Sequence, residues 1–188
     1  MDLGTAVASA WSSGISVYAV AVVLGVGGRL EWVDGPEFLQ RPWVIAVAFG
    51  LFVVELVVDK ISFLDSAWDA VHTFVRPVAG ALLLDASDVS GTTFGLSLGG
   101  AALALSAHGA KASTRLLVNA SPEPVSNVLV SLTEDGLVAA LMTLALTVPE
   151  LALAITTVLA VLSMLVIVVV VRTGRRIIVR RRPPPRGP

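Results

Sequence analysis

The sequence predicts an all-α, polytopic membrane bundle with about six spans. Hydrophobic residues make up 55% of the 188 positions and charged residues only 14%, and the mean hydropathy is +0.86. A soluble domain carries about 25% charged residues, so this composition indicates a chain that lies largely in lipid. Cysteine is absent, which excludes disulfides and thiolate metal sites.

The first half of the chain begins with two apolar runs. The first covers residues 3–28 and has a Ser-Ser-Gly break at residues 12–14. The second covers residues 42–58 and starts with proline, which suits a first helical turn because its missing N–H would have no partner there. A polar connector at residues 31–41 separates them, so we expect one span from each run.

The third element, residues 66–84, has a charged first half and an apolar second half. Asp65 and Ser66 offer an N-cap for it. This pattern fits either a helix at the membrane surface or one that crosses. We expect it to cross, because Asp85 and Asp88 then fall on the outside with most of the other acidic loop residues.

The second half contains three further apolar runs, at residues 92–118, 125–147 and 151–171. The first of these is rich in small residues, which let helices approach closely in lipid. The last has no charged residue and is the clearest span in the chain.

The C-terminal tail, residues 172–188, is strongly basic and rich in proline, so we expect it to be disordered. Basic residues near a span mark the cytoplasmic side, which predicts a multi-pass protein of the cytoplasmic (inner) membrane with both termini in the cytoplasm. We expect the tail to contact anionic lipid and no nucleic acid. Its basic residues are Arg172, Arg175, Arg176, Arg180, Arg181, Arg182 and Arg186.

The two halves of the membrane domain, residues 1–171, align with each other. Fifteen positions separate Gly14 from Arg29, and fifteen separate Gly100 from Arg115. Because each half has an odd number of elements, the second copy would run inverted through the membrane, as in many secondary transporters. The predicted repeats cover residues 4–84 and 92–171, and homo-oligomerisation is left open.

Ionisable side chains inside the predicted spans are the candidate functional residues. Each costs about 2.5–3.5 kcal/mol to insert, so such residues usually face a bundle interior or a wet cavity. Acidic and basic stripes on neighbouring helices predict ion pairs, such as Asp69 or Glu55 with Arg115. The candidate ion or proton pathway consists of Glu55, Asp59, Asp69, His72, Arg76, His108, Lys111, Arg115, Asn127 and Glu134.

Three motifs give the chain a resemblance to a known family. They are Asp65-Ser-Ala-Trp-Asp-Ala-Val-His-Thr-Phe-Val-Arg-Pro77, Ala107-His-Gly-Ala-Lys-Ala-Ser-Thr-Arg115 and Asn119-Ala-Ser-Pro-Glu-Pro-Val-Ser-Asn127. The chain resembles, over roughly residues 12–146, the bacterial integral membrane proteins catalogued as domain of unknown function four-one-two-six. This resemblance implies the membrane fold and carries no established activity.

Two functions fit these observations. The first is a small ion- or proton-coupled transporter, or a channel-like protein, with a polar intramembrane site. The second is a membrane scaffold or lipid-handling protein in which the charges are paired for structure. An enzyme is not expected, because the spacing of the residues provides no nucleophile with a base, no metal-ligand set and no cofactor motif.

Overall fold

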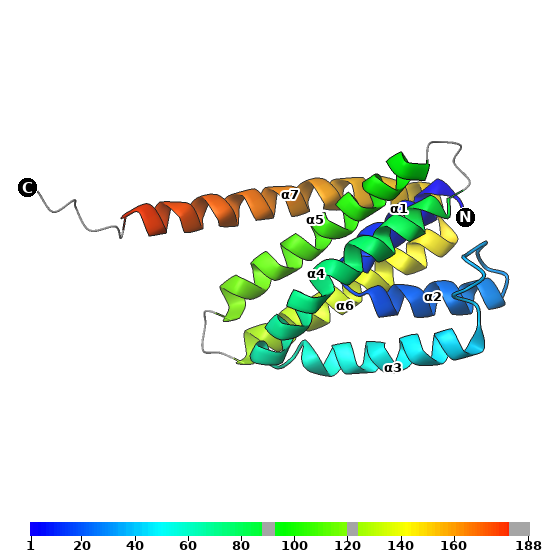
Figure 1. Cartoon of the computed structure of the whole chain (residues 1–188), viewed down its shortest axis with the longest axis horizontal. Helices are drawn as coiled ribbons and strands as arrows, with labels where there is room; N and C mark the ends of the chain where they lie inside the picture. Colours follow the sequence, from blue (N-terminus) through cyan, green and yellow to red (C-terminus); the bar gives the residue numbers. More distant parts are fainter. Residues whose placement is uncertain (88–92, 120–123, 181–188) are drawn as a thin grey trace, which may run out of the picture.

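The computed structural model describes residues 1–87, 93–119 and 124–180, and in this part of the chain all regular secondary structure is helical, without a strand (Figure 1). The all-α prediction is therefore confirmed. The helices are α1 (Leu3–Ser13), α2 (Val17–Arg29), α3 (Pro42–Val58), α4 (Ser62–Asp85), α5 (Thr93–Asn119), α6 (Pro124–Thr147) and α7 (Pro149–Arg180).

Helices α3 to α7 run back and forth along one bundle, each reversing the direction of the one before (Figure 1). Their bounds lie close to the predicted apolar runs. Among the described residues, α6 and α7 are long enough and apolar enough to cross a membrane. Helices α4 and α5 pack closely, because Gly80 and Gly100 face each other: a Cβ on Gly100 would lie 2.1 Å from the carbonyl oxygen of Gly80.

The first apolar run forms a helical hairpin instead of the single crossing that the sequence predicts. The start of α1 lies beside the end of α6, where the Thr5 hydroxyl donates to the Ala145 carbonyl at 2.8 Å. The end of α2 returns to the same place: a Cβ at Gly27 would lie 3.8 Å from the Leu146 side chain, which is also at the end of α6. Both ends of the hairpin therefore lie at one end of the bundle, so the predicted single crossing by this run, and with it the count of six spans, is not confirmed.

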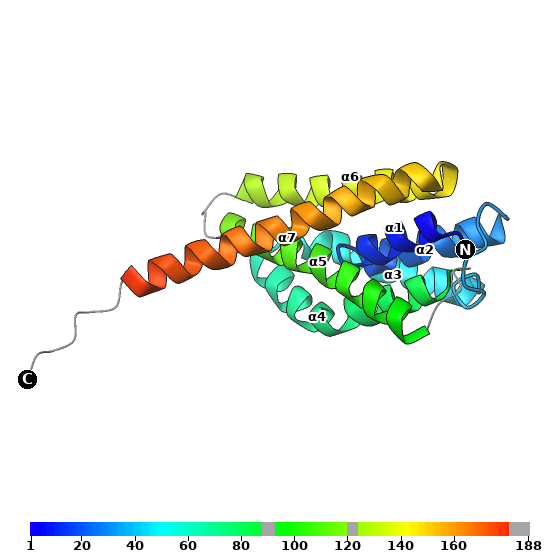
Figure 2. The same cartoon turned by 90° about the horizontal axis from the view of Figure 1, so that it is seen from above.

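The tip of the hairpin is buried in the middle of the bundle. Gly14 lies against the backbone of Ala104, halfway along α5, and a Cβ at Gly14 would lie 2.1 Å from that carbonyl oxygen. Ser16 then adopts an extended conformation and caps α2 by accepting from the Ala19 N–H. Helix α1 is surrounded by α4, α5, α6 and α7 (Figure 2). Non-helical backbone is thus enclosed by protein, where its polar groups find partners.

Two further predictions are not confirmed. The start of α1 lies at the opposite end of the bundle from the C-terminal end of α7 (Figure 1), so the structure does not confirm the prediction that both termini lie on the cytoplasmic side. The predicted pair of inverted three-helix repeats is not confirmed, because the first half begins with a broken hairpin and the second with the continuous helix α5.

Two helix boundaries also differ from expectation. Helix α4 begins at Ser62 with Ile61 as its N-cap, so Asp65 lies within its first turn and is buried. Helix α7 continues to Arg180, so residues 172–180 of the tail are helical where disorder is predicted. Arg172, Arg175 and Arg176 are exposed on this extension. Arg181, Arg182 and Arg186 lie outside the described residues.

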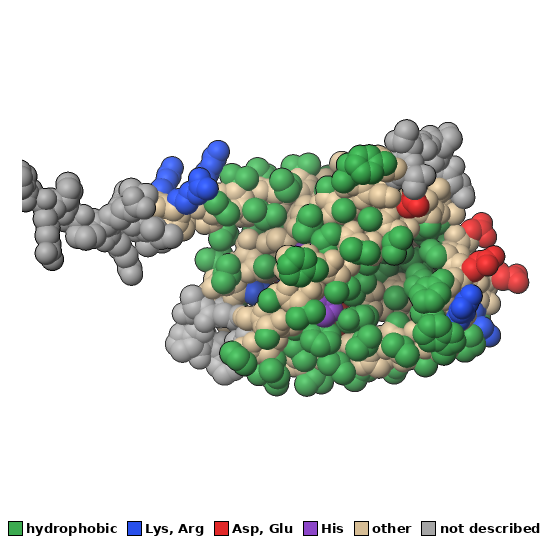
Figure 3. Space-filling model, viewed as in Figure 1, with side chains coloured by type: hydrophobic (Ala, Val, Ile, Leu, Met, Phe, Trp, Pro, Cys, Tyr) green, Lys and Arg blue, Asp and Glu red, His purple; other side chains and the backbone are tan. Residues whose placement is uncertain are grey.

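The distribution of side chains is inside-out relative to a soluble protein. Large apolar residues cover the outer surface, including Phe63 (81% exposed) and Phe74 (79%). Two positions after Phe74, Arg76 is completely buried. Figure 3 shows this apolar surface over the body of the bundle, with charged side chains gathered at its two ends. A monomeric soluble protein rarely exposes apolar surface on this scale.

Candidate functional site

The predicted pathway residues converge on one buried cluster beside the hairpin tip, in which α3, α4, α5 and α6 meet. Nine of the ten are buried, and the side chain of the tenth, Glu134, is 12% exposed. We call this cluster, together with Asp65, the charged network. It consists of two groups, one centred on Arg76 and one on Lys111 with Arg115.

In the first group Arg76 of α4 bridges two carboxylates. Its Nη2 atom lies 3.0 Å from Glu55 Oε1 of α3, and its Nη1 atom lies 2.9 Å from Asp69 Oδ1, two turns earlier on α4. Nη1 also donates to His108 Nδ1 of α5. Because a guanidinium only donates, Nδ1 must be the unprotonated nitrogen and His108 is neutral. Its Nε2–H donates to the Thr73 hydroxyl at 2.9 Å.

In the second group two cations meet three carboxylates. Lys111 Nζ lies 2.7 Å from Asp59 Oδ2 and 3.8 Å from Glu134 Oε2. Arg115 Nη2 lies 2.6 Å from the same Glu134 oxygen and 3.4 Å from Asp59 Oδ2. The third carboxylate, Asp65, is 3.8 Å from Arg115 Nη1, beyond hydrogen-bond distance.

Arg115 also caps the C-terminal end of α3. Its Nη1 atom donates to the Asp59 carbonyl at 2.7 Å and to Asn127 Oδ1 at 2.8 Å. The Asn127 amide donates to the same Asp59 carbonyl at 3.3 Å. Positive charge at a helix C-terminus interacts favourably with the negative end of the helix dipole. The two donors also satisfy a carbonyl that has no partner inside the helix.

The hairpin tip contacts both groups. The Ser16 hydroxyl at the start of α2 donates to Glu55 Oε2. The Ile15 carbonyl, one residue earlier, accepts from Lys111 Nζ at 3.4 Å. The negative charge of Glu55 thus lies at the positive end of a half-helix, and the Lys111 ammonium donates to the Ile15 carbonyl in the turn.

His72 is held by aromatic neighbours at the edge of the network. Its Nδ1–H donates to the Trp68 carbonyl at 2.8 Å, and its Nε2 lies 3.0 Å from the Tyr18 hydroxyl. The Trp68 ring stacks on the imidazole with centroids 4.6 Å apart. In the neutral tautomer, Nε2 accepts from Tyr18, so His72 connects α4 to α2 without carrying charge.

The charges of the network do not balance. The ionic contacts of the described residues join five carboxylates (Glu55, Asp59, Asp65, Asp69 and Glu134) to three permanent cations (Arg76, Lys111 and Arg115). The Arg76 group has two carboxylates for one cation, and the second group has three for two. Each group thus has one excess negative charge when all carboxylates are ionised.

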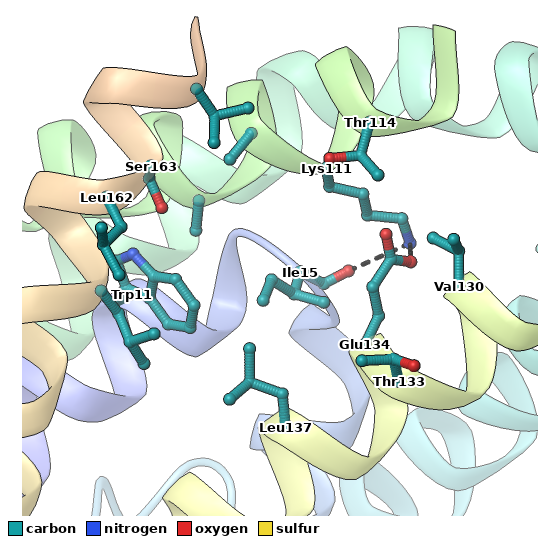
Figure 4. A pocket seen from close by; sticks show the side chains of 14 residues that line it. Trp11, Ile15, Lys111, Thr114, Val130, Thr133, Glu134, Leu137, Leu162 and Ser163 are labelled. Atoms are coloured by element: carbon teal, nitrogen blue, oxygen red, sulfur yellow. Dashed lines mark hydrogen bonds and ion pairs between the residues drawn. The ribbon is translucent and has the colours of Figure 1, made fainter. Parts of the chain in front are cut away.

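Two cavities border the network. One of about 300 Å³ lies between α1, α5, α6 and α7 and is mostly apolar. Figure 4 shows Lys111 and Glu134 at one end of it, with Lys111 reaching the Ile15 carbonyl, and Trp11 and Leu162 at the other. The second, of about 230 Å³, lies between α4 and α5. Within the described part of the chain, no group of three or more His, Asp or Glu side chains is placed to hold a metal ion.

The partners within the network differ from the predicted ones. Glu55 and Asp69 pair with Arg76, whereas Arg115 pairs with Glu134 and Asp59, so the predicted pairing of Glu55 or Asp69 with Arg115 is wrong. The candidate residues predicted from sequence also omit Asp65 and the hairpin residues Ser16 and Tyr18. The Ser-Ser-Gly break was the available signal for the hairpin.

Comparison with known proteins identifies the family and nothing more specific. A family model described as Domain of unknown function (DUF4126) matches residues 3–170, so the chain belongs to this family, as the sequence motifs predicted. No curated protein and no solved structure matches the chain.

Proposed function

We propose that this member of the DUF4126 family is a multi-pass inner-membrane protein that moves protons, or an ion coupled to protons, through the charged network. The observation that carries the proposal is the hairpin: two half-helices whose buried tip touches both charged groups. Discontinuous helices that present their ends to buried charges are a recurring device of secondary transporters.

The surface of the bundle supports the membrane location. Helices α6 and α7 have the length and hydropathy of spans, and the apolar exterior continues over α3, α4 and α5, with Trp43, Phe74 and Phe94 exposed. Ionisable groups enclosed by such a surface are costly and usually functional in membrane proteins. Under this proposal α3 to α7 cross the membrane and the α1–α2 hairpin enters and leaves on one side.

The excess of negative charge supports a role in ion or proton movement. A network that serves only to hold helices together is most stable when its charges cancel, because an uncompensated buried charge is expensive. In this network the carboxylates outnumber the permanent cations by two. A proton or cation that binds and leaves would alternately balance and unbalance the network.

A second candidate function is a non-transporting scaffold or lipid-handling protein. The short ion pairs favour it: Arg76 to Glu55 and Asp69, Lys111 to Asp59, and Arg115 to Glu134 all lie at 2.6–3.0 Å. Such pairs fix the positions of four helices whether or not anything passes between them.

Reconstitution into proteoliposomes distinguishes these two functions. We expect the wild-type protein to carry protons or common monovalent cations under an imposed gradient, and Glu55→Gln and Asp69→Asn to abolish this flux. Each substitution removes the excess charge of the Arg76 group while keeping the shape of the side chain, so the variants should fold. Asp34→Asn, on the exposed connector, is the matched control and should transport as the wild type does.

Flux in folded Glu55→Gln and Asp69→Asn at the wild-type rate would exclude the Arg76 group from the pathway. Absence of flux in the wild type across protons, Na⁺ and K⁺ would favour the scaffold. Folding of each variant is checked by circular dichroism and by monodispersity in detergent, so that a loss of flux is not confused with a loss of structure.

The proposed topology predicts a specific labelling pattern in this cysteine-free chain. A cysteine in a tag before Met1 and one at Asp34 should react with a membrane-impermeant thiol reagent from the same side. Lys60→Cys and Thr173→Cys should react only from the other side. If the first run crossed the membrane once, the tag would instead label together with positions 60 and 173, which would overturn the hairpin topology.

We also propose that the basic extension of α7 contacts anionic lipid. Each Arg near an anionic surface contributes about 1 kcal/mol. A peptide of residues 172–188 should therefore bind vesicles that contain phosphatidylglycerol, and replacing Arg172, Arg175 and Arg176 with Gln should weaken that binding. Equal binding to neutral phosphatidylcholine vesicles would contradict the electrostatic origin.

A further inference from the structure

The cavity between α4 and α5 is lined by the least satisfied carboxylate of the network. The cavity has a volume of about 230 Å³, and Asp65, Asp69, Thr73, His108 and Arg115 line it. Asp65 is 0% exposed, and neither of its carboxylate oxygens has a hydrogen-bond partner in the described structure. Its nearest cation, Arg115 Nη1, is 3.8 Å away.

Arg115 makes no hydrogen bond to Asp65 because its guanidinium N–H groups donate to other acceptors. Its Nη2 atom lies 2.6 Å from Glu134, and its Nη1 atom donates to Asn127 and to the carbonyl of Asp59. Lys111 is likewise occupied by Asp59 at 2.7 Å. Of the three carboxylates in this group, Asp65 is therefore the one whose negative charge is least compensated, by a single contact of 3.8 Å to Arg115.

The second excess charge lies beside the same cavity. Asp69 shares Arg76 with Glu55, and Glu55 also receives the Ser16 hydroxyl. Asp65 and Asp69 are four residues apart on α4, so their side chains lie on one face of that helix. Both excess carboxylates thus adjoin one cavity.

We propose that Asp65 is the proton-binding carboxyl of this protein. A proton delivered through the cavity forms an O–H bond with one carboxylate oxygen, converting the side chain to the neutral acid and removing the excess charge of the Lys111–Arg115 group. Release of the proton restores the carboxylate. The charged or titratable groups around Asp65 are Asp69 on α4, His108, Lys111 and Arg115 on α5, Asp59 at the end of α3, and Glu134 on α6.

A proton suits this site better than a metal ion. The guanidinium of Arg115 lines the cavity and that of Arg76 is bonded to Asp69 and His108, so fixed positive charge stands close to the site. A metal ion needs a shell of several ligands, whereas a proton needs one oxygen. Loss of the proton would make Asp65 compete with Glu134 and Asp59 for Arg115, which connects proton release to the contacts between α3, α4 and α6.

The role of Asp65 in transport rests on the proposed function, but its protonation is measurable without flux. Infrared difference spectra of the reconstituted full-length protein, recorded on changing pH, should contain a carboxylic-acid C=O band that disappears in Asp65→Asn. The band should remain in Asp34→Asn. The same proteoliposomes are assayed for proton flux, which Asp65→Asn should abolish. The neutral amide mimics the protonated acid, so this variant should fold.

The outcomes separate the two proposals. A titrating band that is unchanged in folded Asp65→Asn, that is absent from the wild type, or that is lost in Asp69→Asn instead would overturn the assignment. Wild-type proton flux that Asp65→Asn retains would also overturn it, while leaving the proposed function intact. A band that is lost in Asp65→Asn, in a protein that carries no flux, would confirm the proton site and refute transport. Stabilisation by Na⁺ that depends on Asp65, without the band, would replace the proton with a cation.

Discussion

Replacing Arg76 with Gln should strongly destabilise the folded protein. Arg76 is 0% exposed and is the cation that bridges Glu55 and Asp69. Without it, two carboxylates remain buried without a cation, and His108 Nδ1 loses its donor. Breaking a buried ion pair from one side costs about 3–5 kcal/mol. Thermal unfolding in detergent, followed by circular dichroism, should therefore show a much lower midpoint or no folded protein.

Two variants identify the origin of that loss. Arg76→Gln combined with Glu55→Gln returns the group to one excess negative charge, as in the wild type, and should recover part of the stability. Arg29→Gln removes an exposed arginine whose side chain donates to the Gln40 carbonyl at 3.3 Å, and should change stability by less than about 0.5 kcal/mol. If Arg76→Gln unfolded at the wild-type midpoint, the network would not hold the bundle together.

Local sequence signals predicted the positions of most of the helices. The apolar runs at residues 42–58 and 125–147 correspond closely to α3 and α6. Proline at the first position of α3 and the polar connectors mark where helices begin and end, because these signals act within a few residues. The convergence of the ionisable residues was also predictable, since charged side chains avoid the lipid-facing surface.

The hairpin and the ion-pair partners depend on contacts between distant segments. A run of 26 residues at positions 3–28 is long enough for one span, and its Ser-Ser-Gly break fits a kink as well as a reversal. The reversal is stabilised by Gly14 against Ala104 and by Ser16 and Ile15 against the network. Likewise, which cation faces Glu55 depends on how α3, α4 and α5 are rotated, which helical spacing alone does not determine.

Replacing Arg115 should separate the end of α3 from α5 and α6. This one guanidinium bonds to Glu134, to Asn127 and to the Asp59 carbonyl that ends α3. Arg115→Gln leaves Lys111 as the single cation for three carboxylates, and we expect a loss of about 3–5 kcal/mol. Hydrogen exchange should accelerate at residues 55–61 and much less in the first turns of α7, which does not contact the guanidinium.

Arg115→Lys separates charge from geometry. A lysine keeps the positive charge but lacks the planar fork that reaches a carbonyl and a carboxylate at once. We therefore expect its stability to lie between those of Arg115→Gln and the wild type, with exchange at residues 55–61 still accelerated. Lys60→Gln, an exposed cation at the same end of the bundle, is the control. A lysine variant as stable and as protected as the wild type would show that only the charge of Arg115 matters.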